Sequence, residues 1–151
     1  MYKAEGGILT NRGFVKHWPN DMSSFARFLS VAIGTLILYQ SAVVAPAINI
    51  ALPVEPAAVL LRFIWPIFFA LVGGLALVGM VTTRKHRAGL RVNLITTVSM
   101  VVCFLLVPVI NGAKDADNMT LWKILHMVTV ALTFVALILH LIYLFRSHKR
   151  A

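Results

Sequence analysis

Two histidines lie inside an apolar stretch near the C-terminal end of this 151-residue chain. His126 and His140 belong to the stretch from Leu121 to Phe145, whose only charged residue is Lys123. A stretch of this length can cross a lipid bilayer as a helix, for which roughly 20 residues are enough. An ionisable side chain at membrane depth is costly and indicates a functional site by default. The two imidazoles could ligate haem, take part in a proton path or join neighbouring helices through hydrogen bonds.

Haem ligation is suggested by the spacing of the two histidines. On one helix they lie ~21 Å apart along the axis and about 40° apart around it. This resembles the His-x13-His pairs of respiratory b-type cytochromes, which implies that His126 and His140 are axial ligands to two stacked haem b groups. Each haem then needs a second imidazole, and the other apolar stretches contain no histidine. A parallel homodimer that pairs this helix with its twin would supply the missing ligands.

Proton or ion transport is a second interpretation, in which the chain is a small transporter or channel component. Such pathways usually involve intramembrane Asp or Glu as well, and all five acids of this chain lie outside the apolar stretches. We find no Ser/His/Asp, Cys/His or metal-ligand spacing. We therefore expect no catalytic site, no metal site and no enzymatic activity.

Helix joining is the third interpretation, and it involves polar stripes on several helices. Polar residues recur at steps of three and four, which keeps them on one face of a packed helix. We expect these faces to turn inward, because lipid cannot satisfy polar groups, and to form hydrogen bonds between helices without any cofactor. The stripe residues are Thr35, Tyr39 and Asn49 in the first apolar stretch, Asn93 and Thr96 at the third, and Thr129, Thr133 and Tyr143 beside the histidines of the fourth.

Four apolar stretches must position these side chains. With 60% hydrophobic and only 13% charged residues, the chain belongs to the membrane class. We predict an all-α integral membrane four-helix bundle with helices at about 25–52, 56–83, 90–111 and 119–146. Residues 1–23 then form a cytoplasmic N-terminal segment, residues 24–147 the transmembrane domain and residues 148–151 a cytoplasmic tail.

The basic residues predict the orientation. They flank the apolar stretches and collect at the N-terminal segment, between the second and third helices and at the C-terminus. Because positive charge favours the cytoplasmic side, both termini should be cytoplasmic (N-in/C-in), in a bacterial inner membrane. The formal net charge is +9, but the basic residues are not interleaved with aromatic residues as on a nucleic-acid-binding surface. We therefore expect no nucleic-acid partner. The residues expected to bind anionic headgroups of the lipid bilayer are Arg84, Lys85, Arg87, Arg91, Arg146, Lys149 and Arg150.

A longer pattern resembles a known family. The segment 34–69, "GTLILYQSAVVAPAINIALPVEPAAVLLRFIWPIFF", together with "VPVIN" at 107–111 and "LH" at 125–126, is similar to a bacterial four-span membrane protein family of unknown function related to the transmembrane protein 205 family. The resemblance implies four helices in a membrane and no established reaction. His126 matches a position of that family, whereas His140 has no counterpart in it. We expect an accessory or structural subunit of a membrane complex, with other membrane subunits or a homodimer as partners, or a stand-alone bundle.

Overall fold

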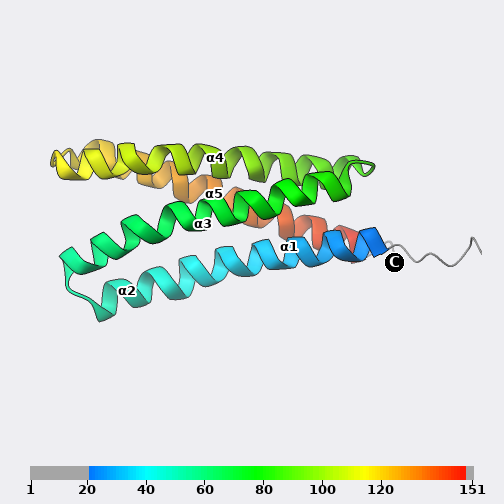
Figure 1. Ribbon diagram of the computed structural model, residues 1–151, viewed down its shortest axis with the longest axis horizontal. Coiled ribbons are helices and arrows are strands. Elements are labelled where there is room, and N and C mark those ends of the chain that lie inside the picture. Colours follow the sequence, from blue (N-terminus) through cyan, green and yellow to red (C-terminus); the bar gives the residue numbers. More distant parts are fainter. Residues whose placement is uncertain (1–20, 149–151) are drawn as a thin grey trace, which may run out of the picture.

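The computed structural model describes residues 21–148 as helices joined by short turns (Figure 1). The predicted N-terminal segment up to residue 20, and the anchors Lys149 and Arg150, lie outside the described residues. The elements are α1 (Asp21–Tyr39), a π-helical turn η1 (Gln40–Val44), α2 (Ala45–Ala51), α3 (Val54–Thr83), α4 (Arg87–Asp115) and α5 (Met119–His148). Because α1, η1 and α2 follow one another without a break, the described chain consists of four helical rods.

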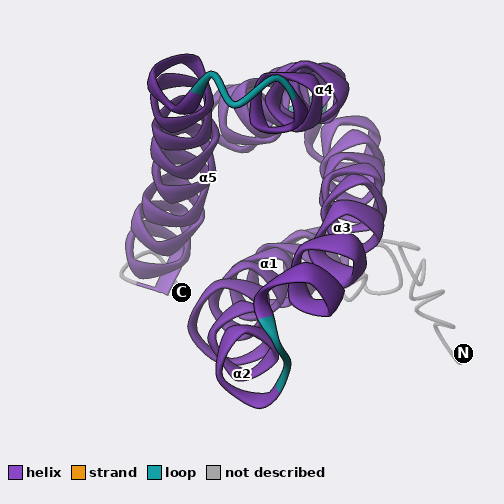
Figure 2. Ribbon diagram, turned by 90° about the vertical axis from the view of Figure 1, so that its left-hand side faces the viewer, coloured by secondary structure: helices purple, strands orange, loops and turns teal. Residues whose placement is uncertain are grey.

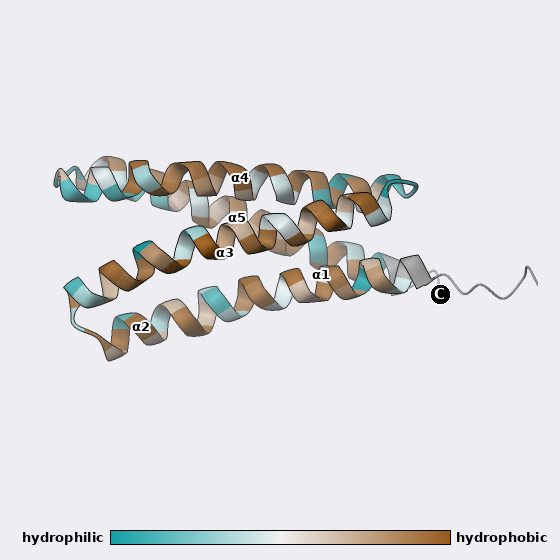
Figure 3. Ribbon diagram, viewed as in Figure 1, coloured by the Kyte–Doolittle hydropathy of each residue, from teal (hydrophilic) through white to brown (hydrophobic). Residues whose placement is uncertain are grey.

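All four rods are long and apolar enough to cross a membrane, over residues 24–51, 54–83, 87–115 and 119–146. The prediction of an all-α membrane protein with four long apolar helices is therefore confirmed. The helix over 87–115 exceeds the predicted 90–111, because backbone hydrogen bonds continue through the polar flanks, as from Ala116 N–H to the Gly112 carbonyl at 3.0 Å. Hydrophobic residues dominate the middle of each rod, and hydrophilic residues are more frequent at the ends (Figure 3).

The helices enclose a common interior in the order α1, α3, α4, α5 (Figure 2). Neighbouring rods run in opposite directions, so that the start of α1, the α3–α4 turn and the end of α5 lie at one end of the bundle (Figure 1). We call this the basic end, because Arg84, Lys85 and Arg87 lie in or beside its turn. The apolar core between the rods contains Ile33, Ile37, Phe68, Phe69, Val72, Ala76, Met100, Cys103, Val107, Ala136 and Leu137.

The turn at the opposite end, between α4 and α5, is held by local geometry. Asp117 adopts a left-handed conformation with φ 54°, which reverses the chain within a few residues. The side-chain oxygen of Asn118 accepts a hydrogen bond from the Leu121 N–H at 3.1 Å and thereby caps α5. The short connection makes α4 and α5 antiparallel neighbours.

The first rod contains one wide turn. The Ala45 N–H donates to the Gln40 carbonyl, five residues back, and the next residue is Pro46, which has no N–H to donate. A single π turn of this kind accommodates such a break in the regular ladder and changes the direction in which the following side chains point. Beyond it, α2 contributes no buried residue to the bundle.

Candidate functional site

His140 lies at the centre of a buried polar contact between α4 and α5. Its side chain is 0% exposed, and its Nε2 atom lies 3.1 Å from the hydroxyl oxygen of Thr96, which is also fully buried. The other ring nitrogen, Nδ1, is buried without a hydrogen-bond partner among the described residues. The imidazole thus links two helices through one nitrogen, within the interior that α1 and α3 complete.

A second buried polar contact, formed by Asn93 and Thr83, lies closer to the basic end than the Thr96–His140 contact. The Asn93 side chain donates hydrogen bonds to the Gly89 carbonyl at 2.9 Å and to the Thr83 hydroxyl at 3.4 Å. The Thr83 hydroxyl donates in turn to the Gly79 carbonyl at 2.7 Å. A Cβ atom at Gly89 would lie 2.9 Å from Thr83 and 3.1 Å from the hydroxyl of Tyr143. The absence of a side chain at Gly89 therefore lets α3, α4 and α5 approach closely at this end.

Two threonines occupy the middle of α5. The Thr129 hydroxyl donates to the His126 carbonyl and the Thr133 hydroxyl to the Thr129 carbonyl, each at 2.8 Å. The thiol of the buried Cys103 donates to the same Thr129 carbonyl at 3.8 Å. Both threonine hydroxyls thus bond within α5, and the Cys103 thiol of α4 provides the contact between the two helices.

His126 has different surroundings, near the α4–α5 turn. It is partly buried, and its ring stacks on Trp122 with the centroids 5.3 Å apart and the planes 6° from parallel. The Lys114 ammonium lies 5.3 Å from the centre of the Trp122 ring. This row of a cation and two rings is typical of a membrane-interface position, where amphipathic rings meet the headgroups.

The structure does not supply what haem ligation requires at His140. A haem shared with a twin helix needs this imidazole on the outer surface, but it is enclosed in the interior and bonded to Thr96. Within residues 21–148 the only histidines besides His126 and His140 are His86, in the α3–α4 turn, and His148, the last residue of α5, and neither lies within the middle of a helix. The described part of the chain also contains no group of three or more His, Cys, Asp or Glu that could hold a metal ion.

The polar stripes divide into buried and exposed groups. Asn93, Thr96, Thr129 and Thr133 are buried, and Tyr143 is half-buried.

The prediction of an inward stripe on the first helix is wrong for the described chain. Thr35, Tyr39 and Asn49 are all exposed, Tyr39 by 58%. Thr35 and Tyr39 precede the wide turn η1 and Asn49 follows it, and spacing alone cannot tell which way these side chains face. Another side of this helix faces the interior: its buried positions are Ala26, Leu29, Ser30, Ile33, Gly34, Ile37 and Gln40.

Gln40 is one of four buried polar residues that sequence reasoning missed, the others being Ser30, Thr83 and Ser99. Its side chain is 8% exposed, and its amide nitrogen is buried without a hydrogen-bond partner among the described residues. The signal was the apolar series Ile33 and Ile37, which steps by four and then by three to reach Gln40 on the same face.

The end opposite the basic end has an ion pair and two shallow pockets. Arg62 and Asp115 form two hydrogen bonds between α3 and α4, one of them 3.2 Å long. Beside this pair a pocket of about 340 Å³ lies between the two helices, lined by Arg62, Pro66, Phe104, Leu105, Val107, Pro108 and Asn111.

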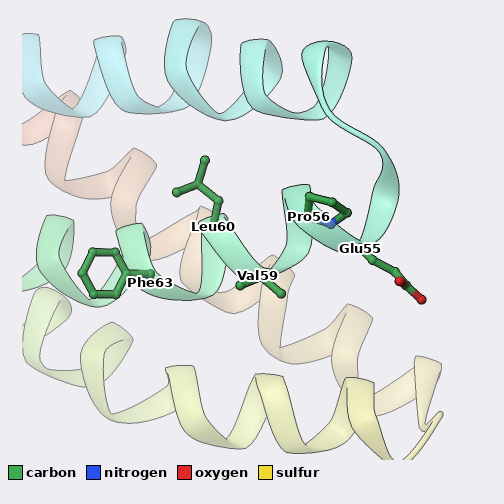
Figure 4. A pocket seen from close by; sticks show the side chains of 5 residues that line it. All are labelled: Glu55, Pro56, Val59, Leu60 and Phe63. Atoms are coloured by element: carbon green, nitrogen blue, oxygen red, sulfur yellow. The ribbon is translucent and has the colours of Figure 1, made fainter.

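The second pocket, of about 660 Å³, lies along the start of α3 (Figure 4) and is lined by Glu55, Pro56, Val59, Leu60 and Phe63. Glu55 is its only ionisable group, and it points away from the other four side chains (Figure 4). Neither pocket brings together a nucleophile and a base.

The fold and these contacts define an all-α integral membrane protein in which buried contacts such as Thr96–His140 and Asn93–Thr83 join the helices. No family model, no curated protein and no solved structure matches the chain.

Proposed function

We propose that the protein is a non-enzymatic membrane subunit that associates with other membrane helices through the exposed polar side of α1 and α2. The observation that carries this proposal is the position of Thr35, Tyr39 and Asn49, which are exposed within a membrane-spanning rod. We call these three exposed residues the α1–α2 stripe.

The α1–α2 stripe is costly in lipid if nothing covers it. Within the described residues, the side chains of Thr35 and Tyr39 make no hydrogen bond, and the Asn49 amide donates only to the Ala45 carbonyl, at 2.8 Å. In hydrocarbon there is no water to take the remaining donors and acceptors, so each unpaired group carries a penalty. A partner helix with polar side chains at the same depth removes that penalty.

The burial of the rods supports the same conclusion. Between 28% and 33% of the residues in the most apolar part of each span are buried inside the chain. Lipid can cover the apolar remainder of α3, α4 and α5. It cannot satisfy the hydroxyls and the amide of the α1–α2 stripe, which makes this side the best candidate for contact with another protein.

We also infer that the basic end is cytoplasmic, so that both ends of the described chain face the cytoplasm. Arg84, Lys85, Arg87, Arg91 and Arg146 lie at the basic end, against Arg62, Lys114 and Lys123 toward the other. The positive-inside tendency favours this orientation, and anionic headgroups of an inner-membrane leaflet would bind the basic end.

Photo-crosslinking in native membranes tests the partner role. A photoreactive amino acid replaces Tyr39 in one variant and Leu105, an exposed apolar residue of α4 (62%), in the matched control. The proposal predicts a discrete protein adduct from position 39 and none from position 105. Irradiation that gives only lipid adducts at both positions would contradict it.

A further inference from the structure

The pocket between α3 and α4 lies where both helices contain a proline. Pro66 of α3 and Pro108 of α4 have no N–H group, so the carbonyls four residues earlier lack their usual helical hydrogen bond. These carbonyls belong to Arg62 and Phe104, and all four residues line this one pocket, of about 340 Å³. Two backbone acceptors that need a donor are therefore brought to one place, within spans where lipid tails offer no donor.

The lining of this pocket changes from apolar to polar toward the end opposite the basic end. Phe104 and Leu105, on the side of the membrane centre, are 45% and 62% exposed. Asn111 lies ~10 Å further along α4, and beside it Arg62 pairs with Asp115 across the two helices. This order matches a lipid molecule, whose chains lie toward the membrane centre and whose headgroup lies at the surface.

We propose that this pocket binds the headgroup of phosphatidylethanolamine, a phospholipid with a phosphate and a primary ammonium group. The Arg62–Asp115 pair places one positive and one negative group beside the pocket. A guanidinium has five N–H donors, and Arg62 uses only two of its nitrogens to bond Asp115, so donors remain for the phosphate. The carboxylate and the two backbone carbonyls can accept the hydrogen bonds of the ammonium.

Other occupants fit these groups less well. The pocket volume is at the small end of the range for small-molecule sites, roughly 300–1,000 Å³, so it suits a headgroup and not a helix. The quaternary ammonium of phosphatidylcholine has no N–H to donate to a carbonyl. Anionic phosphatidylglycerol would meet Asp115 as well as Arg62, and the pair has no net charge to attract it. Recognition therefore depends on the N–H donors of the ammonium.

Lipid competition measured by native mass spectrometry tests the proposal. The full chain in mild detergent is mixed with equal amounts of phosphatidylethanolamine and phosphatidylcholine that carry identical acyl chains. A parallel mixture contains phosphatidylethanolamine and phosphatidylglycerol. Asp115→Asn removes the carboxylate, and Pro108→Ala restores an N–H for the Phe104 carbonyl. Asp117→Asn, in the adjoining turn and outside the pocket lining, is the matched control, and circular dichroism checks that each variant is helical.

We expect the natural chain and Asp117→Asn to bind phosphatidylethanolamine about two- to tenfold more than phosphatidylcholine, because one hydrogen bond changes affinity by about that factor. The ratio should fall toward one in Asp115→Asn and in Pro108→Ala. Equal binding of the two lipids by the natural chain, or a preference for phosphatidylglycerol, would overturn the proposal. A preference that survives in both pocket variants, or that Asp117→Asn lowers equally, would also overturn it, because the lipid would then bind elsewhere.

Discussion

At the scale of single residues, buried polar contacts such as Thr96–His140 and Asn93–Thr83 join helices of this bundle. His140 is the clearest case, because an imidazole in the middle of a transmembrane helix first suggests a ligand or a proton carrier. Its enclosure and its contact with Thr96 instead make it a link between α4 and α5.

Replacing Thr96 by valine keeps the shape of the side chain and removes the hydroxyl. We expect Thr96→Val to lower the free energy of unfolding by about 0.5–2 kcal/mol, because a buried ring nitrogen loses its partner. Thr120→Val, at an exposed position near the start of α5, is the matched control and should change little. Denaturation by SDS titration in mild detergent measures both, and equal effects would contradict a special role for the Thr96–His140 contact.

Two glycines of α3 allow a test of close packing. A Cβ atom at Gly79 would collide with the side-chain oxygen of Asn93, whereas one at Gly74 would meet nothing within 4 Å. We expect Gly79→Ala to destabilise the protein by about 1–3 kcal/mol through overpacking. Gly74→Ala should be neutral or stabilising by up to about 1 kcal/mol, because alanine favours the helix. The thermal unfolding midpoints of the two variants are measured in detergent. A lower midpoint for Gly74→Ala than for Gly79→Ala would contradict the close contact between Gly79 of α3 and Asn93 of α4.

At the scale of the elements, α3 and α4 form the tightest pair. Asn93, Thr83 and the neighbouring glycines hold them at the basic end, and the Arg62–Asp115 pair links them near the other end. Both helices also contain an internal proline, Pro66 and Pro108, and the two rings line one pocket.

The ion pair should contribute little to stability. Arg62 and Asp115 are 36% and 59% exposed, and solvent screens a pair of this kind. We expect Asp115→Asn to lower the free energy of unfolding by less than about 1 kcal/mol. SDS titration in mild detergent measures this loss, with Asp117→Asn in the adjoining turn as the control. A loss above about 3 kcal/mol would indicate that the pair is shielded from water.

Much of this architecture was predictable from the sequence, because length and hydropathy alone decide whether a helix can span a bilayer. The sequence was less informative about which face of each helix turns toward the interior. Asn93 and Thr96 lie inside, whereas Thr35 and Tyr39, with the same kind of spacing, lie outside. Periodicity shows which residues share a face, and only the packing of the helices against one another decides which face turns inward.

The contacts of the site were not predictable for a related reason. The pairing of Thr96 with His140 depends on the relative height of two helices, which their individual patterns do not fix. The wide turn at Gln40–Val44 has a clear local correlate in Pro46, but a proline can also kink a helix without a π turn. The burial of Gln40, the first residue of this turn, was missed, although the steps of its apolar neighbours Ile33 and Ile37 would have predicted it.

At the scale of the whole molecule, charge asymmetry predicts the orientation in the membrane. Asp117→Cys places a thiol in the α4–α5 turn, and Lys85→Cys places one in the α3–α4 turn at the basic end. In intact cells we expect a membrane-impermeant maleimide to label Asp117→Cys and not Lys85→Cys, because we infer from the charge asymmetry that the basic end is cytoplasmic. Labelling after lysis shows that both thiols are reactive, and labelling of position 85 alone in intact cells would reverse the orientation.

The account as a whole depends on association through the α1–α2 stripe. The most direct measurement is the mass of the assembly released from native membranes into nanodiscs, for the natural chain and for the variant Thr35→Val, Tyr39→Phe, Asn49→Leu. These side chains are exposed, so the variant should retain its helical circular dichroism. We predict an assembly larger than one chain for the natural protein and a single folded chain for the variant. A natural protein that is already a single folded chain, or a variant that keeps the full assembly, would contradict the account.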